Sequence, residues 1–302
     1  MEKEALFRAM VNDVSRELKI LPDKPEETPD NTLRALWFLA AGTPRSFDPK
    51  ICDDPLPDLN NEAINHLKEL IKQRLSGIPL AHLTGRQQFM GLEFLVGSEA
   101  LIPRKETEIL GRSVIDLLKN VVKQRGKAIV VDVCTGSGNL ALSFSYYEPG
   151  AQVYASDLSN DAVQLARKNA IHLGLDNRVE FREGDLLEPF KDDFFIGNVD
   201  LLICNPPYIS SKKLDAMPEE IIQFEPRLAF DGGGFGVKIL FHLIKDAPIF
   251  LKEGGWLCFE VGLGQGQSMI KRVESNGHYR KICSSCDDNG NIRVIMAQIP
   301  ES

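Results

Sequence analysis

A short polar segment ends one of the most apolar runs in the chain. The run VDLLIC, residues 199–204, is followed directly by Asn205, Pro206, Pro207 and Tyr208, called the NPPY segment below. Proline has no N–H for a sheet ladder, so two prolines end strand pairing and fix the directions of nearby carbonyls. The Asn205 side-chain oxygen and the Pro206 carbonyl are then two rigid acceptors beside a tyrosine ring, a set that could hold and orient a planar NH2 group. The simpler interpretation is a strand terminator, because Asn-Pro is a common turn signal.

Glycines and acids follow three further apolar runs. Each run is strand-like and ends in a short polar segment. The residues are Asp132, Thr135, Gly136, Ser137 and Gly138 at the end of the first run, Asp157 after the second and Asp185 after the third. Ligands of open α/β sheets bind outside the carboxyl ends of the strands, so these residues and the NPPY segment are expected to meet at one edge. Glycines let the backbone approach a ligand closely, and an acid after the second strand is placed to take two ribose hydroxyls.

The glycine loop does not match two well-known nucleotide-binding patterns. It lacks the third glycine of the dinucleotide fingerprint, and no lysine follows it as in a P-loop. A G-x-G pair alone is also compatible with a plain strand-to-helix turn. Together, the loop and the three acids resemble the S-adenosylmethionine site of class I methyltransferases. That resemblance implies that the loop lies under the methionine part, that Asp157 holds the ribose and that Asp185 meets the adenine amine, with S-adenosylhomocysteine as the product.

Beside such a cofactor, the NPPY segment fits methylation of a planar NH2 group. The nitrogen of an amide or of an adenine amine is a poor nucleophile, because its lone pair is delocalised. Two acceptors that bind its two N–H groups would orient it toward an activated methyl group, so catalysis is mostly positioning and desolvation. No strong general base is required. We expect Asn205, Pro206 and Tyr208 to be catalytic, Asn205 to contact the cofactor as well, and these three with Pro207 to bind the substrate.

The elements that position these residues follow from hydrophobic periodicity. Apolar residues at helical spacing predict three helices, over 4–18, 31–42 and 60–77. Alternation with glycine punctuation over 82–104 predicts a β-hairpin. From residue 106 nearly continuous apolar strands alternate with helices, which predicts an α/β fold with a parallel sheet covered on both faces and a closing antiparallel hairpin. The expected division is a small N-terminal helical domain (1–77), a β-hairpin linker (78–105) and a catalytic domain (106–302).

Composition excludes several classes of protein. The chain has 302 residues, of which 43% are hydrophobic and 26% charged, as is typical of a globular protein. No apolar run approaches the roughly 18 residues that cross a membrane, so we expect a cytoplasmic protein without a membrane partner. The net charge of −8 does not suit direct binding of long duplex DNA. Cys283 and Cys286 form a single CxxC pair, a weak zinc signal, and no metal is expected.

Other segments carry a more specific resemblance, to the HemK/PrmC family. They are GIPLAHLTGRQQFMGLEF, LIPRKETE, FEPRLAFDGG and GGWLCFEVG, and the likeness runs from about Gly77 to the C-terminus. It implies a helical N-terminal domain, a hairpin linker and a Rossmann-like class I methyltransferase domain. It also implies N5-methylation of the glutamine side-chain amide in the GGQ loop of a class I peptide chain release factor. The N-terminal helices would then dock this partner, or serve only as a stabilising cap.

Two alternatives share the same chemistry. The fold and the NPPY segment could serve an amide or amine of another protein or of a small molecule. DNA adenine methyltransferases also carry NPPY, but they need a target-recognition domain and a basic surface, and neither is visible here. The choice between these substrates depends on the rest of the chain, not on the NPPY segment.

The family pattern extends to further residues, with four departures. The PR-x-ETE segment implies a stretch packed near the cofactor, at Arg104, Glu106, Thr107 and Glu108. A second signature, at Glu225, Pro226 and Arg227, fits a functional or a purely structural loop equally well. The departures are Cys134 in place of glycine, Lys105 in place of proline, Phe235 in place of aspartate, and His242 where an aromatic or basic residue is frequent. Cys134 is expected only to adjust the loop, whereas Phe235 is expected on the substrate side and bears on which substrate is used.

Overall fold

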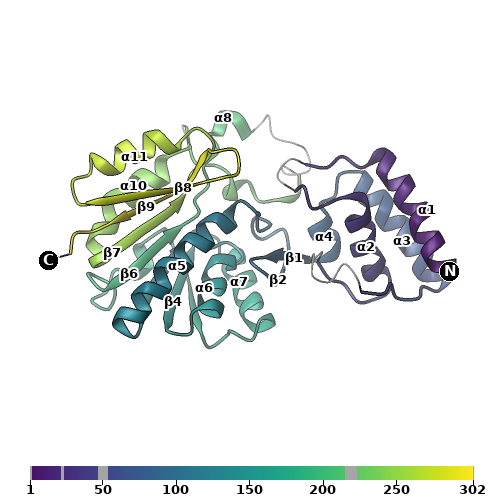
Figure 1. The fold of residues 1–302 in the computed structure, drawn as a ribbon, viewed down its shortest axis with the longest axis horizontal. Coiled ribbons are helices and arrows are strands. Elements are labelled where there is room, and N and C mark those ends of the chain that lie inside the picture. The colour runs from purple at the N-terminus through teal and green to yellow at the C-terminus, as the bar shows by residue number, and fades with distance from the viewer. Residues whose placement is uncertain (1, 22–23, 47–53, 215–222, 235, 302) are drawn as a thin grey trace.

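The computed structural model describes residues 2–21, 24–46, 54–214, 223–234 and 236–301 (Figure 1). A group of short helices lies at one end, and a large sheet covered by helices forms the rest. A small two-stranded sheet joins the two parts. No helix in these ranges has the length and apolar character needed to cross a membrane.

The N-terminal helices bury their apolar stripes against one another. They are α1 (Glu2–Glu17), α2 (Pro29–Ala40), α3 (Asn61–Leu75) and the short α4 (Leu80–Thr84). Thr28 and Asn60 cap α2 and α3 by accepting hydrogen bonds from backbone N–H groups in their first turns. Trp37 is buried in this core, and its indole N–H donates to the Pro57 carbonyl at 2.9 Å. These helices therefore have a hydrophobic core of their own.

The linker is an antiparallel hairpin of two short strands. Strands β1 (Arg86–Phe89) and β2 (Leu92–Leu95) pair directly through the turn at Met90 and Gly91, both at positive φ. The Ser46 N–H and hydroxyl, which follow α2, both donate to Glu93 on β2 at 2.8 Å. The hairpin thus ties the helical part to the chain that leads into the large sheet.

The large sheet has seven strands in the order β5-β4-β3-β6-β7-β9-β8. The strands are β3 (Ala128–Val133), β4 (Ala151–Asp157), β5 (Val179–Glu183), β6 (Val199–Cys204), β7 (Leu251–Glu260), β8 (Lys281–Cys286) and β9 (Ile292–Gln298). The first five in the chain run parallel, and β9 pairs antiparallel with both β7 and β8. The predicted α/β class, with its closing antiparallel hairpin, is confirmed.

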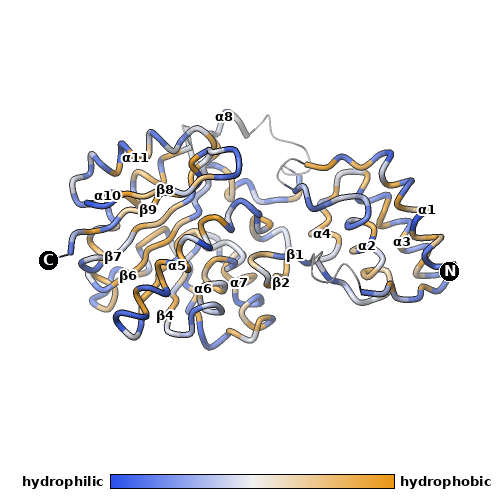
Figure 2. The backbone as a smooth tube through the Cα atoms, viewed as in Figure 1, coloured by the Kyte–Doolittle hydropathy of each residue, from blue (hydrophilic) through white to orange (hydrophobic). Residues whose placement is uncertain are grey.

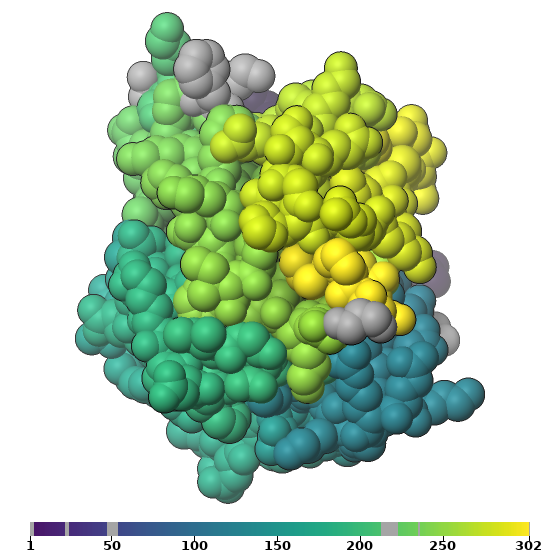
Figure 3. All heavy atoms as spheres, turned by 90° about the vertical axis from the view of Figure 1, so that its left-hand side faces the viewer, coloured from purple at the N-terminus to yellow at the C-terminus, as the bar shows by residue number. Residues whose placement is uncertain are grey.

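Helices cover both faces of this sheet and produce two separate cores. On one face lie α5 (Thr107–Arg125), α6 (Asn139–Tyr147) and α7 (Asn160–His172), and on the other α10 (Lys238–Phe250) and α11 (Gly266–Glu274). Figure 2 shows the central strands as almost continuously apolar. Figure 3 looks at the end away from the N-terminal helices, where the chain from α5 onward supplies nearly all the visible surface. Because both faces are buried, functional groups can reach solvent only at the sheet's ends.

Some elements were not predicted. The sequence analysis did not find α4 and α11, which are only 5 and 9 residues long, so each offers few turns of periodicity. Short one-turn segments also occur at Glu188–Phe190 (η2), Ser211–Leu214 (α8) and Arg227–Ala229 (η3). The segment Arg227–Ala229 contributes to the site described next.

Candidate active site

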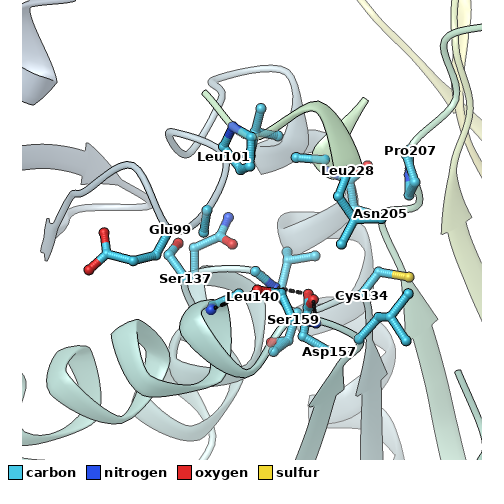
Figure 4. Close-up of a pocket in the computed structure, with 18 of the residues that line it drawn as sticks. Glu99, Leu101, Cys134, Ser137, Leu140, Asp157, Ser159, Asn205, Pro207 and Leu228 are labelled. Atoms are coloured by element: carbon cyan, nitrogen blue, oxygen red, sulfur yellow. Dashed lines mark hydrogen bonds between the residues drawn. The ribbon is translucent and has the colours of Figure 1, made fainter. Parts of the chain in front are cut away.

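A cavity lies at the carboxyl ends of the parallel strands, as Figure 4 shows. Its lining comes from many parts of the chain, chiefly residues 99–101 with 103–104, residues 134–137, residues 157–159, residues 184–186, Asn205 with Pro207, and residues 226 and 228–229. Asp157 and Ser159 lie on the side of the strand ends, and Leu101 and Leu228 lie across the cavity from them. The predicted residues Thr135, Gly136, Ser137, Asp157, Asp185 and Asn205 all line this cavity.

The glycine loop curls tightly between β3 and α6. Cys134, Gly136 and Gly138 all have positive φ, at 59°, 56° and 80°. A Cβ on Gly138 would approach Ala166, Leu142 and Phe181 within 3.1–3.2 Å, so glycine is needed there for close packing of the helix start. Gly138 is not among the residues that line the cavity; it supports the loop from the side of the core.

Asp132 supports the loop from behind. Its side chain is completely buried and is not among the residues that line the cavity. The Thr135 hydroxyl donates to Asp132 Oδ2 at 2.6 Å, which holds the loop at its first turn. Burial raises the pKa of Asp132 to about 7, against the lowering effect of the Thr135 hydroxyl. Asp132, which the sequence predicts as a cofactor-binding residue, therefore lies behind the loop and outside the cavity lining.

Asp157 joins the loop to the next strand. One carboxylate oxygen accepts from the Gly136 N–H at 2.8 Å, and the other accepts from the Ser159 N–H at 2.9 Å. Burial raises the pKa of this carboxyl group, and the backbone donors oppose the rise. Each oxygen retains a lone pair that can accept from a hydroxyl. Asp157 therefore fixes the loop and still offers acceptors to a diol in the cavity.

A second, more open groove meets the cavity at the NPPY segment. Asn205 and Pro207 line both spaces, and so do Leu101, Arg104 and Ala229. Pro206 and Tyr208 line only the groove. A ligand in the groove can therefore meet a ligand in the cavity at Asn205.

The orientation of the Asn205 amide is fixed. Its Nδ2 donates to the Thr107 hydroxyl at 3.0 Å, at the first residue of α5. Within the described part of the chain, no hydrogen bond occupies the Asn205 side-chain oxygen or the Pro206 carbonyl. Both predicted acceptors are thus available, and Thr107 determines which end of the amide faces away from α5.

Glycines hold the NPPY backbone in close contact with its surroundings. A Cβ on Gly236 would lie 2.2 Å from the Tyr208 carbonyl oxygen, and one on Gly262 would lie 2.9 Å from the Tyr208 ring. The Gln265 side chain donates to that same carbonyl at 3.0 Å. The Ile209 N–H donates to the Phe230 carbonyl at 3.0 Å. The segment is therefore held from three sides by elements far away in the sequence.

The second signature, around Glu225, is part of the wall between cavity and groove. Glu225 is buried, forms an ion pair with Arg104, and accepts from the Ile102 N–H at 2.8 Å. The residues after it, Pro226, Leu228 and Ala229, line the cavity. Of the two interpretations offered for this loop, the contacts give it a structural role in the wall of the site.

Sequence reasoning missed several residues of the site. Leu158 and Leu186 flank Asp157 and Asp185 at the cavity, and Leu158 is 54% exposed. Their position directly after the acids was the signal that could have identified them. Glu260, which is buried, lies in the segment GGWLCFEVG, which predicted a strand and carried part of the family resemblance, but nothing in it indicated a role for the carboxylate.

The residues that depart from the family pattern lie in different parts of the structure, and Cys134 alone among the described ones lines the cavity. Cys134 lines the cavity, and His242 is exposed on α10. Phe235 lies outside the described residues. Cys283 packs partly against the core on β8, whereas Cys286 is exposed at the end of the strand.

The lining fits a nucleoside with a polar tail. Asp157 has acceptors for a diol, and Leu158 and Leu186 offer apolar surface beside it. The Ser137 hydroxyl in the glycine loop is buried and has no hydrogen-bond partner within the described ranges, although the residue lines the cavity. A buried hydroxyl without a partner is costly unless a ligand satisfies it. These features match the parts of S-adenosylmethionine.

Comparison with known proteins identifies the fold and the family of the chain. The family model described as "Methyltransferase small domain" matches residues 113–237. Two solved structures share the fold: the catalytic domain of hMettl16 (TM-score 0.53, 14% identity, 78% of this chain and 84% of that one) and human methyltransferase 10 domain containing protein (TM-score 0.51, 16% identity, 80% and 98%). At this level of identity, these structures show the fold alone.

Relatives found by sequence share a higher identity with this chain than these two structures do. The release factor glutamine methyltransferase of Moorella thermoacetica is 37% identical over 80% of this chain and 82% of its own length. The protein of the same name from Bacillus subtilis is 31% identical over 89% and 91%. The methyl donor of such enzymes is S-adenosylmethionine, and S-adenosylhomocysteine is the product. With these relatives and with the site at the strand ends, the chain belongs to the family of release factor glutamine methyltransferases.

Proposed function

We propose that this protein methylates the side-chain amide nitrogen of a glutamine, the one in the GGQ loop of a class I peptide chain release factor. The observation that carries the proposal is the Asn205 amide, which Thr107 holds so that its oxygen and the Pro206 carbonyl are both free to accept. These acceptors lie where the groove meets the cavity that fits the methyl donor. The names of the relatives supply the substrate.

In this proposal the residues of the protein bind the methyl donor and orient the substrate amide. When bound, S-adenosylmethionine supplies a methyl group that is already activated as a sulfonium. The Asn205 oxygen and the Pro206 carbonyl accept the two N–H groups of the substrate amide and direct its nitrogen toward the cavity. The Tyr208 ring lies beside the plane of that amide. Removal of water from this junction strengthens both hydrogen bonds, and the amide nitrogen releases one proton once it carries the methyl group.

The N-terminal helices and the groove define how a protein partner would approach. We propose the domain division 1–77, 78–105 and 106–302, with the first domain as a docking surface for the release factor. The helices have their own core, and the hairpin connects them to residues 99–104 beside the cavity. Because the partner is a component of translation, we place the reaction in the cytoplasm. Long duplex DNA is not the proposed partner, given the net charge of −8.

The test is direct transfer to a defined protein. The purified enzyme, S-adenosylmethionine and a recombinant class I release factor are mixed, and the added methyl is mapped by peptide mass spectrometry. We expect one methyl on the GGQ glutamine amide and none when that glutamine is replaced by glutamate. Absence of transfer together with measurable cofactor binding would overturn the substrate and favour another protein or small-molecule amide or amine.

A further inference from the structure

Glu260 is a buried carboxylate directly behind the NPPY segment. It is the last residue of β7 and is 1% exposed. The groups that face it come from three other elements: the hydroxyl of Thr107 at the start of α5, the hydroxyl of Tyr208 after β6, and Arg293 on β9. Glu106, next to Thr107, is the other acidic group that faces it. Thr107 and Tyr208 belong to the chemistry proposed above, whereas Glu260, Arg293 and Glu106 have no part in it.

The Thr107 hydroxyl accepts from Asn205 and can donate its own hydrogen to Glu260. Asn205 Nδ2 is a donor, so the Thr107 oxygen accepts from it at 3.0 Å and the hydrogen of the hydroxyl is left to donate elsewhere. Glu260 faces the hydroxyls of both Thr107 and Tyr208. Among the residues that the structure describes, neither oxygen of its buried carboxylate has a hydrogen-bond partner. The hydrogen bonds of catalytic networks often tighten only when substrate binds.

We propose that Glu260 is the positioning residue of the NPPY segment: its carboxylate accepts from the hydroxyls of both Thr107 and Tyr208. Through Thr107 it keeps the Asn205 oxygen directed at the substrate amide, and through Tyr208 it holds the ring. This inference deepens the proposed function and rests on it. A carboxylate has two acceptor oxygens and no donor, so it can satisfy both hydroxyls at once.

The charge of Glu260 is compensated within the cluster. Arg293 lies 3.5 Å from Glu260 and 3.4 Å from Glu106, and its side chain is 7% exposed. Burial nevertheless raises the pKa of Glu260 to about 7, against the lowering effects of the Thr107 hydroxyl, Arg293 and the Tyr208 hydroxyl. We therefore expect the carboxyl group to change its protonation state close to neutral pH.

Protonation would reverse one hydrogen bond of the network. A neutral carboxyl group donates through its O–H, so it can no longer accept from both hydroxyls in the same way. The Thr107 hydroxyl could then turn, and the Asn205 amide could present its NH2 end to a substrate that needs an acceptor. Because the active form is the ionised one, turnover is expected to fall as the pH decreases through the pKa of Glu260 and to level off above it.

The kinetic test uses pairs of matched variants. Thr107→Val keeps the shape of the side chain and removes the hydroxyl, and it is expected to lower kcat about 10- to 100-fold, with affinity for S-adenosylmethionine within about twofold of the unchanged protein. Thr107→Ser restores the hydroxyl and should recover most of that loss. Glu260→Gln should lower kcat about tenfold and abolish the acid limb of its pH profile. An unchanged kcat in Thr107→Val, or an unchanged acid limb in Glu260→Gln, would overturn the proposal.

A second measurement does not depend on the substrate. The carboxyl carbon of Glu260, labelled with ¹³C and assigned through Glu260→Gln, is titrated by NMR in the protein alone. We expect a pKa well above that of an ordinary glutamate, and a further increase in Thr107→Val, where a donor to the ionised form is lost. No difference between Thr107→Val and the unchanged protein would refute the network, even if the release factor proved to be the wrong substrate. Failure of the unchanged enzyme to methylate a release factor would count only against the proposed function.

Discussion

The cofactor cavity and the NPPY segment meet at Asn205, yet they are built in different ways. The cavity is formed mainly by loops at the strand ends: in the loop after β3, the Gly136 N–H donates to the carboxylate of Asp157, the last residue of β4. The NPPY segment is held by side chains from remote parts of the chain, among them Thr107, Gln265 and, by our proposal, Glu260. A backbone site is thus specified by short motifs, whereas an oriented side chain needs the whole fold.

The largest effect is expected on the stability of the protein, at the loop around Glu225 in the wall between the cavity and the groove. Glu225→Ala removes the carboxylate that forms an ion pair with the buried Arg104 and leaves the Ile102 N–H without its acceptor. Removal of one partner of a buried ion pair typically costs about 3–5 kcal/mol, so we expect a decrease of that size in the free energy of unfolding. Urea denaturation measures it.

The matched control for this variant is Glu274→Ala. Glu274 is exposed at the end of α11, and its replacement should change the free energy of unfolding by less than about 0.5 kcal/mol. If Glu225→Ala costs less than about 1 kcal/mol, the wall does not depend on this ion pair.

The sequence predicted the cavity well, for a physical reason. Asp157, Asp185 and the loop from Thr135 to Gly138 follow strands whose parallel order brings their carboxyl ends together. Any chain with those strands in that order must place these residues at one edge. The α/β class and the closing hairpin follow from the same strand patterns.

The supports of the NPPY segment could not be predicted in the same way. Thr107 was noticed only as part of the PR-x-ETE segment, and nothing in the sequence indicates that its hydroxyl receives the Asn205 amide 98 positions later. Glu260 reads as the end of an ordinary strand, and its burial depends on how β7 pairs with β9. Contacts of this kind are set by strand order and helix placement, which a local pattern does not encode.

The second-largest expected effect is that of a substitution at Asn205, where the cofactor cavity and the NPPY segment meet. Asn205→Ala removes one of the two acceptors for the substrate amide, and we expect kcat to fall about 10²- to 10³-fold, as when one preorganised hydrogen bond is lost from an active site. Affinity for S-adenosylmethionine should stay nearly unchanged, because the other lining residues remain. Calorimetry gives the affinity, and a methyl-transfer assay with saturating cofactor gives kcat. An equal loss in both would show that Asn205 is structural.

The converse effect is expected at Asp157. Asp157→Ala removes the acceptors offered to the ribose and also releases the Gly136 N–H, so affinity for S-adenosylmethionine should fall about 10- to 100-fold. With saturating cofactor, kcat should change much less than in Asn205→Ala. Asp157→Asn keeps one acceptor oxygen and is expected to lie between the unchanged protein and the alanine variant. A larger loss in kcat than in affinity would contradict the division between cavity and NPPY segment.

The smallest effect tests whether the cavity tolerates its most unusual residue. Cys134 has φ of 59°, and the left-handed region costs a non-glycine residue about 1–2 kcal/mol. Cys134→Gly removes that strain, but glycine loses more conformational entropy on folding, by about 0.5–1 kcal/mol, and the contacts of the thiol are lost. We therefore expect the free energy of unfolding to change by less than about 1 kcal/mol, with cofactor affinity and kcat nearly unchanged, measured by urea denaturation, calorimetry and methyl transfer.

Gly136→Ala is the opposite change two residues away. Gly136 has φ of 56° and lines the same cavity, so alanine acquires the strain that Cys134 already carries and also places a methyl group beside the ligand. It should be less stable by about 1–2 kcal/mol and bind S-adenosylmethionine more weakly. If Cys134→Gly instead lowers cofactor affinity as strongly as Gly136→Ala does, the Cys134 side chain takes part in binding, and the cavity is then not a backbone site alone.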